Sequence, residues 1–561
     1  MDPLIAPYGG SLVDRMADAA HLDALKREAV RFPVVDLNAR QLCDLELLLN
    51  GGYSPLQGFM GRADYEEVLA HACLSDGQFW PLPVVLDVSA ALGSRLHVGD
   101  HLALRDPEGL MVAVLQVEEL WQPDLAREAR LVFGSGEKGR ARTQAFLEEQ
   151  GSWYIGGRVT GTSLDGHHDY TALRLSPSEM RARFARAGWR RVIAFQPDRP
   201  MHRAHVEFTL SAALARDAHL LIHAASEDAS GDRAAYFALI RTLQAVEARY
   251  PAATTLLAVA PLHARGAGLR EVWARAIVSR NYGCSQLIVG EMPDEASEAA
   301  QTREWAGRAQ AALGVELIAF PPMVYVEDRA QHMPAAQVPS GTRTLTLSQE
   351  ELSRRLSDGL NIPDWFSYPE VVELLQQAHP PRHRQGFTLF FTGLSGAGKS
   401  TLARVLTTRL LQLGGRSVTL LDGDVVRKHL SSELGFSKEH RNLNVRRIGF
   451  VAAEITKNRG VAICAPIAPY ASVRRAVREM VEAHGGFVEI HVCTPLEVCE
   501  TRDRKGLYAK ARQGLLKEFT GVSDPYEVPE TPELALDTSV LGVEEAVARI
   551  LLKLEQLGYL R

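Results

Sequence analysis

A nine-residue stretch in the last third of the chain limits most strongly what this sequence can fold into: "GLSGAGKST", residues 393–401. It fits the pattern G-x-x-x-x-G-K-[ST], between an apolar run at 387–393 and a helical pattern at 399–415. Glycines in such a turn let backbone N–H groups surround phosphate oxygens, because no Cβ obstructs them. A glycine-rich turn that only packs is the alternative interpretation. We expect a nucleoside triphosphate to be bound by Gly393, Leu394, Ser395, Gly396, Ala397, Gly398, Lys399, Ser400 and Thr401.

Four side chains in and near this loop carry the expected chemistry. Lys399 would reach the β- and γ-phosphates, and the Ser400 hydroxyl would contact Mg²⁺. The segment "LDGDVVR" places Asp422 and Asp424 at the end of the next predicted strand, where ligands bind in open α/β sheets. These carboxylates would hold Mg²⁺ through water or accept a proton from an attacking hydroxyl. A strand-end turn stabilised by aspartates is the alternative.

The division of the chain is clearest at "QQAHPPRHRQG", residues 376–386, where prolines, a glycine and basic side chains interrupt the apolar periodicity. Beyond it, apolar strands alternate with helical stretches, which predicts a parallel sheet covered on both faces. Near the N-terminus, short strands such as 80–88 are punctuated by glycine and proline, which favours a mostly β domain. The expected α/β multidomain chain has a β-rich domain at 1–170, an α/β domain at 171–330, a small helical piece with the linker at 331–384 and a second α/β domain at 385–561.

Composition excludes several classes of function. The net charge is −6, from 62 basic and 68 acidic side chains, so neither a nucleic-acid partner nor an anionic membrane is indicated. The first residues lack the pattern of a signal peptide, and no apolar run is long enough to span a bilayer. Six scattered cysteines without CxxC spacing suggest neither zinc nor disulfides. We expect a cytoplasmic enzyme whose anionic ligands are held by local groups.

Residues 386–561 resemble adenylylsulfate kinase. Six segments carry the resemblance, in the family's order: "GLSGAGKST", "LDGDVVR", "GFSKEHRNLNVRR", "CAPIAPY", "PLEVCETRDRKGLYAKAR" and "FTGVSDPYEVPETPELALDT". The family uses ATP and Mg²⁺ to phosphorylate the 3′-hydroxyl of adenylyl sulfate, which gives 3′-phosphoadenylyl sulfate and ADP. The resemblance therefore implies a P-loop kinase with ATP, Mg²⁺ and adenylyl sulfate as its cofactor and ligands.

This resemblance also assigns roles to residues. Asp424 would lie nearest the 3′-hydroxyl and act as a catalytic residue with Lys399, and Arg502 is a candidate for contact with the adenine of ATP. This sequence departs from the residues common in the family at Val425, His440 and Ala468, and none of these changes removes a phosphate ligand or a candidate base. The residues expected to hold adenylyl sulfate are Arg427, Arg441, Asn444, Lys510 and the two aromatic rings that would sandwich its adenine, Phe436 and Phe519.

Residues 1–380 resemble ATP sulfurylase, which makes adenylyl sulfate and pyrophosphate from ATP and sulfate. The segments that carry this resemblance are "GGYSPLQGFM", "WPLPVVLDV", "WYIGGRV", "MHRAH", "AGLREVWARAIVSRNYG" and "IPDWFSYPEVVELL". They imply a β-rich, PUA-like N-terminal domain followed by a Rossmann-like nucleotidyltransferase domain. Because members of the family form homo-oligomers, a dimer or a hexamer is also implied.

The ligand-binding segments of this family are altered here. Its loop Gln-Thr-Arg-Asn-Pro-x-His reads Gln-Pro-Asp-Arg-Pro-Met-His at 196–202, and its Gly-Arg-Asp-His-Ala-Gly falls on 290–295, so Asp198 and Glu291 replace arginines. A third motif, at 228–232, has lost its lysine. At about 4 Å and an effective dielectric near 20, one charge pair is worth about 4 kcal/mol, so two reversals beside anions remove most of the binding. We expect a vestigial site, formed by Gln196, Asp198, Arg199, His202, His205 and Glu291.

Three functions follow from these observations. The first is an adenylylsulfate kinase fused to a sulfurylase-like domain whose own reaction is lost or severely impaired. The second is a fully bifunctional enzyme that converts sulfate and ATP to 3′-phosphoadenylyl sulfate. The third is a regulatory protein that binds 3′-phosphoadenylyl sulfate, as the kinase-like domain of fungal sulfurylases does; the intact loop at 393–401 argues against it.

Overall fold

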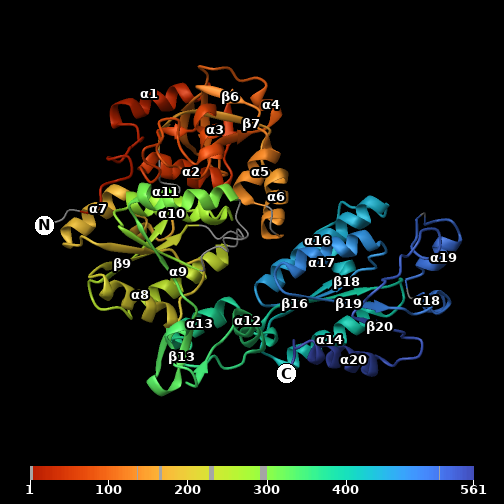
Figure 1. The fold of residues 1–561 in the computed structure, drawn as a ribbon. Helices are drawn as coiled ribbons and strands as arrows, with labels where there is room; N and C mark the ends of the chain where they lie inside the picture. The colour runs from red at the N-terminus through yellow and green to blue at the C-terminus, as the bar shows by residue number, and fades with distance from the viewer. Residues whose placement is uncertain are drawn as a thin grey trace. The chain divides into compact units, whose positions relative to one another are not determined.

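The computed structural model describes residues 4–134, 137–162, 167–226, 233–290, 300–503, 505–516 and 518–561. Packing divides the chain into two compact units, which we call the front unit (Met1–Gln349 with Ile362–Ala378) and the back unit (Glu350–Asn361 with His379–Arg561) (Figure 1). The domain boundaries expected from the sequence remain predictions, because this division follows packing only. No helix among the described residues has the length and apolar character needed to cross a membrane.

The N-terminal part of the front unit contains the expected sheet, together with helices that the sequence analysis did not anticipate. Strand β7 (Trp153–Gly161) pairs with four neighbours, and a Cβ at its Gly157 would lie 1.9 Å from the carbonyl oxygen of Gln116, so glycine is required there. The strand expected at 80–88 is shorter, because only Leu86–Val88 (β3) pairs. The other strands are β1 (Val34–Asp36), β2 (Gly58–Phe59), β4 (His101–Arg105), β5 (Met111–Gln116) and β6 (Glu119–Trp121), and the helices are α1 (Ala19–Ala29), α2 (Ala39–Asn50), α3 (Arg62–His71), α4 (Ala90–Gly93), α5 (Leu125–Phe133) and α6 (Glu137–Glu149).

A five-stranded parallel sheet follows, in the order β10-β9-β8-β11-β12. The strand order reverses beside β8 (Val192–Phe195), and in such sheets ligands bind at the carboxyl ends of the strands near that reversal. The loop at 196–202 leaves this end of β8 and leads into α8 (Arg203–Ala215). The remaining elements are β9 (His219–Ala225), β10 (Thr255–Ala260), β11 (Gln286–Val289), β12 (Glu316–Ala319), α7 (Pro177–Arg186), α9 (Arg233–Glu247), α10 (Gly268–Asn281) and α11 (Ala300–Leu313).

The small helical piece expected at 331–384 is only partly helical, which corrects that prediction. An antiparallel sheet formed by β13 (Met323–Val326), β14 (Gln331–Pro334) and β15 (Thr344–Leu345) precedes its helices. These strands are too short to show a clear alternation of apolar and polar residues, so no periodic pattern predicts them. Two helices follow, α12 (Gln349–Asp358) and α13 (Pro369–Ala378).

The back unit is a parallel sheet in the order β17-β18-β16-β19-β20, as expected. Two clusters of buried apolar side chains cover it, one that includes residues of α14 and α20 and one that includes residues of α16 and α17. The strands are β16 (Phe387–Thr392), β17 (Val418–Asp422), β18 (Val461–Ala465), β19 (Gly486–Val492) and β20 (Leu534–Leu536), and the helices are α14 (Lys399–Leu413), α15 (Gly423–His429), α16 (Lys438–Lys457), α17 (Ala471–Glu482), α18 (Leu496–Arg502), α19 (Leu507–Arg512) and α20 (Val543–Gln556).

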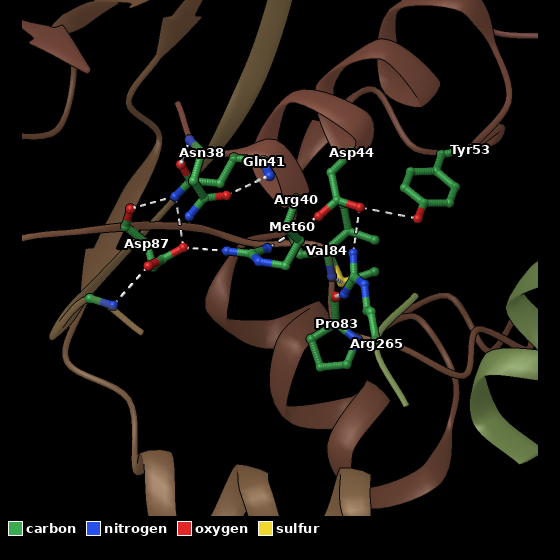
Figure 2. Close-up of polar contacts among 11 residues, drawn as sticks. Asn38, Arg40, Gln41, Asp44, Tyr53, Met60, Pro83, Val84, Asp87 and Arg265 are labelled. Atoms are coloured by element: carbon green, nitrogen blue, oxygen red, sulfur yellow. Dashed lines mark hydrogen bonds and ion pairs between the residues drawn. The ribbon is translucent and has the colours of Figure 1, made fainter. Parts of the chain in front are cut away.

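A buried polar network joins α2 of the N-terminal domain to the loop after β10 (Figure 2). Asp44, whose side chain is 2% exposed, is ion-paired with Arg265 and, at 3.2 Å, with Arg40. It also accepts a hydrogen bond from the hydroxyl of Tyr53. Arg40 is ion-paired in turn with Asp87, which is 5% exposed. Because charges this deeply buried are costly to leave unpaired, the network fixes the loop after β10 against the N-terminal domain.

We predict that Asp44→Ala lowers the free energy of unfolding of the front unit by about 3 kcal/mol or more, because it leaves Arg265 buried without its carboxylate. Urea titration followed by tryptophan fluorescence measures this unit alone, since all seven tryptophans lie in it. Glu118→Gln, which removes an exposed partner of Arg158, is the control and should change stability by less than about 0.5 kcal/mol. Equal effects of the two substitutions would contradict the structural role of the network.

Candidate functional site

The loop at 393–401 lies where the sequence predicts it, between β16 and α14. Its three glycines have positive φ angles, 143° at Gly393, 77° at Gly396 and 103° at Gly398. A Cβ at Gly393 would lie 2.4 Å from the carbonyl oxygen of Val492 on β19, so another residue would force the loop away from the sheet. The loop places the N-terminus of a fifteen-residue helix at its end, an arrangement that attracts phosphate.

The side chain of Lys399 is folded into this loop. Its Nζ donates hydrogen bonds of 2.8 Å to the carbonyl oxygens of both Gly393 and Leu394. Burial lowers the pKa of Lys399 to about 8, well below the ordinary value for a lysine. The carbonyls hold the ammonium at the mouth of the glycine turn, where phosphate oxygens would take their place.

Side chains from three other segments fix the outer side of the loop. The hydroxyl of Tyr508 donates to the carbonyl of Ser395 at 2.9 Å, and those of Thr494 and Thr538 donate to the carbonyl of Ala397. Arg502 donates two hydrogen bonds of 2.7 Å to Thr538. Arg502 therefore lies close to the loop, although its expected contact with adenine stays a prediction.

The two aspartates end up in different environments. Asp422 is the last residue of β17 and is buried; its Oδ1 caps α15 by accepting the N–H of Asp424. Its Oδ2 is buried without a hydrogen-bond partner, with a nitrogen of Arg404 at 4.0 Å. Asp424, expected at the strand end, lies instead in the first turn of α15, with its side chain 71% exposed. Only Asp422 is therefore held rigidly.

Asp424 forms an ion pair with Lys505, a lysine to which the resemblance assigned no role. Both side chains, with Asp422, also act electrostatically on Lys399, so this group of charges lies together. Lys510, for which the resemblance implied a role in binding, is exposed on α19. A basic run in the sequence does not show which of its lysines faces the site.

Apart from Lys510, the residues expected to bind adenylyl sulfate lie on α15, on α16, in the segment between these two helices and in the turn at 519–524. The guanidinium of Arg427 lies 4.5 Å from the centre of the Phe436 ring, which is largely exposed. Phe519 packs edge-on against Tyr508, with 5.0 Å between ring centres. Asn444 is buried, and its Oδ1 has no hydrogen-bond partner. The sandwich of an adenine between Phe436 and Phe519 stays a prediction.

Arg441 is held by groups that the sequence did not reveal. It donates hydrogen bonds to the hydroxyls of Thr520 and Tyr470 at 2.8 and 2.9 Å, and its Nη2 lies 2.8 Å from a carboxylate oxygen of Asp524. The contacts described above connect the glycine loop through Tyr508 and Phe519 to Arg441. Charge interactions connect Lys399 with Asp424, and Arg427 with both Asp424 and Arg441, so the glycine loop, these cations and an exposed carboxylate lie near one another in the back unit.

The loop at 196–202 in the front unit, which we call the front loop, contrasts with this site. The Nε of Arg199 lies 3.0 Å from Oδ1 of its neighbour Asp198, and both side chains are exposed. Gln196 donates a hydrogen bond of 3.2 Å to the hydroxyl of Ser279. The one arginine in the loop is therefore neutralised by the aspartate that replaces the family's arginine.

His202 ends this loop and His205 lies in the first turn of α8, and hydrogen bonds within the protein hold both rings. Nδ1 of His202 contacts the hydroxyl of Ser367 at 2.8 Å, and Nδ1 of His205 accepts the backbone N–H of His202 at 3.1 Å. Burial lowers the pKa of His202 to about 3 and that of His205 to about 4, so both rings are neutral at pH 7. Neither offers a positive charge to an anion. Glu291 and the motif at 228–232 lie outside the described residues.

We predict that the affinity of the back unit for ATP falls as the pH rises above about 8. Below this pH Lys399 is charged in both free and bound protein, whereas above it binding requires proton uptake and weakens by about tenfold per pH unit. Dissociation constants measured by calorimetry from pH 7 to 9.5 test this. Lys399→Arg, which stays charged, should show a nearly flat profile; a wild-type profile equally flat would contradict the lowered pKa.

Three family models match this chain in order. A PUA-like domain matches residues 5–164, ATP-sulfurylase matches 171–378 and adenylylsulphate kinase matches 385–537. The expected PUA-like, nucleotidyltransferase and P-loop kinase folds are thereby confirmed.

Similar proteins of known name match over the full length. The sulfate adenylyltransferase of Emericella nidulans is 44% identical over 567 residues, covering 99% of each chain, and that of Neosartorya fischeri is 43% identical over the same length and share. The solved structure of a hexameric APS kinase from Thiobacillus denitrificans is 48% identical, with a TM-score of 0.83 and 100% of both chains covered. This chain therefore belongs to the sulfate adenylyltransferase family, in the form that joins an ATP-sulfurylase domain and an adenylylsulphate kinase domain in one polypeptide.

Proposed function

We propose that the back unit is a working adenylylsulfate kinase, which transfers the γ-phosphate of ATP to the 3′-hydroxyl of adenylyl sulfate. The observation that carries this proposal is the intact loop at 393–401, with Lys399 buried inside it and an accessible carboxylate, Asp424, in the same group of charges. Such a carboxylate can accept the proton of an attacking hydroxyl, a step that the transfer reaction needs.

The proposed reaction is a single displacement at phosphorus. The loop N–H groups and Lys399 hold the β- and γ-phosphates, while Arg427 and Arg441 hold the anionic part of adenylyl sulfate. The 3′-oxygen attacks the γ-phosphorus, the bond to the β–γ bridging oxygen breaks, and ADP leaves with that electron pair. Asp424 accepts the hydroxyl proton. Because Lys505 is paired with Asp424 in the structure, this contact must loosen before the carboxylate reaches the hydroxyl.

The residues present fit a magnesium ion delivered with ATP. Among the described residues, no group of three or more His, Cys, Asp or Glu side chains is arranged to hold a metal ion. Magnesium commonly uses one or two protein oxygens and otherwise water and phosphate. The Oδ2 of Asp422, which accepts no hydrogen bond, and the hydroxyl of Ser400 can supply them. When bound, the ion would neutralise charge that develops on the transferred phosphate.

Two interpretations of the front unit remain, and they are favoured by different observations. The relatives that match over the full length are named sulfate adenylyltransferase, which favours a second activity, so the bifunctional interpretation has the better support from the comparisons. The comparisons do not confirm the loss of sulfurylase activity that we expected from the sequence. What supports it is local: the pairing of Asp198 with Arg199 and the neutral histidines leave the loop without net positive charge for sulfate.

Assembly of this chain into a homo-oligomer is also proposed. The similar solved structure from Thiobacillus denitrificans is described as hexameric, and its match covers both chains completely. A hexamer of this chain would be about six times 61.6 kDa, which sedimentation would distinguish from a dimer.

The full-length protein should form ADP in the presence of ATP and adenylyl sulfate, because the loop at 393–401 is intact and holds the Lys399 side chain. This is measured beside a second assay, sulfate-dependent release of pyrophosphate from ATP. ADP formation alone supports a kinase with a silenced front unit, and both activities support the bifunctional enzyme. Absence of both would contradict the proposed kinase and leave a regulatory protein.

The variant Asp198→Arg sharpens the second assay. If the front loop binds sulfate poorly because of its charge, an arginine at 198 should raise sulfate-dependent pyrophosphate release by about tenfold or more. Each charge pair is worth at least about 1.4 kcal/mol after screening. ADP formation from adenylyl sulfate should not change. If the wild-type protein already releases pyrophosphate rapidly, the bifunctional interpretation is correct and the charge argument is wrong.

A further inference from the structure

One ion pair in the back unit joins two segments of the proposed adenylyl sulfate site. Arg441 lies on α16, and Asp524 ends the turn at 519–524. Their side chains are only 11% and 17% exposed, so water screens the pair weakly. The carboxylate of Asp524 also accepts a hydrogen bond of 2.7 Å from the hydroxyl of Tyr470. The three side chains form a closed network, since Tyr470 also contacts Arg441.

The turn that Asp524 closes is itself tightly bonded. The N–H of Asp524 donates to the carbonyl of Phe519 at 3.1 Å, and the N–H of Gly521 donates to the carbonyl of Asp524 at 2.8 Å. Thr520, in the same turn, accepts a hydrogen bond from Arg441. Movement of Asp524 would therefore displace Phe519, the ring proposed to stack on adenine, relative to α16.

Two side chains of α16 at this contact have polar atoms that lack a hydrogen-bond partner. Arg441 and Asn444 are three residues apart on α16 and so lie on one side of the helix. Nε of Arg441 and Oδ1 of Asn444 are both buried without a hydrogen-bond partner. Buried polar groups without partners are uncommon in folded proteins and call for an explanation. A ligand with an anionic group and a hydrogen-bond donor would provide partners for both atoms.

We propose that Asp524, acting with Tyr470, is a positioning residue for adenylyl sulfate: it fixes the guanidinium of Arg441 and the turn that carries Phe519 in one arrangement. This inference rests on the proposed kinase function and adds a residue to which the resemblance gave no role. Without Asp524, the ligand must order both segments when it binds, and this cost weakens binding without affecting the glycine loop.

The test uses the full-length protein and steady-state kinetics with each substrate varied in turn. Asp524→Ala should raise KM for adenylyl sulfate by about tenfold, with kcat and KM for ATP nearly unchanged. Asp524→Asn keeps an oxygen acceptor without the charge and should give a smaller increase. Tyr470→Phe, which removes one hydrogen bond, should change KM in the same direction. Glu545→Gln, which removes an exposed partner of Arg549 on α20, is the control and should match the wild type.

Each other outcome would overturn the inference in a recognisable way. A lower KM for adenylyl sulfate would show that Asp524 competes with the substrate for Arg441. A parallel rise in both KM values would show that the turn only supports the fold, and unchanged values would show that the network has no role. If the wild-type protein forms no ADP with adenylyl sulfate, the proposed kinase function itself fails, and this inference fails with it.

Discussion

The close approach of the glycine loop to strand β19 is the constraint on which the back unit depends. Gly393 has room for no side chain beside the carbonyl of Val492, and the positive φ angles that follow turn the chain directly into α14. This turn brings Lys399 back over the loop carbonyls and buries its ammonium. A larger residue at 393 would move the loop, the lysine and the start of the helix together, and with them the place where the phosphates would bind.

The two units differ in the groups that pair with the charged side chains of their candidate sites. In the back unit, two cations are paired with groups that a ligand can replace, the loop carbonyls at Lys399 and a mostly exposed carboxylate at Lys505, while the turn at 519–524 holds Arg441 in place. In the front loop, the arginine is paired with its immediate neighbour, Asp198, and burial keeps both histidines neutral. Residues 196–202 by themselves therefore present no net positive charge to an anionic ligand.

The sequence predicted what depends on local patterns and missed what depends on tertiary contacts. The glycine loop, the alternating strands and helices of the back unit and the family of each half could be recognised, because each is encoded in consecutive residues. The roles of Lys505 and Asp524 could not, because these residues meet Asp424 and Arg441 only after the chain has folded. The strands at 323–345 were missed for another reason, since two to four residues per strand carry almost no periodic signal.

The most direct test of the central claim is the position of the transferred phosphate. The full-length protein is incubated with ATP labelled in its γ-phosphate and with adenylyl sulfate, and the nucleotide product is analysed by mass spectrometry and phosphorus NMR. The account predicts that the label appears as a phosphate monoester on the 3′-oxygen of an intact adenylyl sulfate. Label found only in inorganic phosphate, or a product that has lost its sulfate, would contradict it.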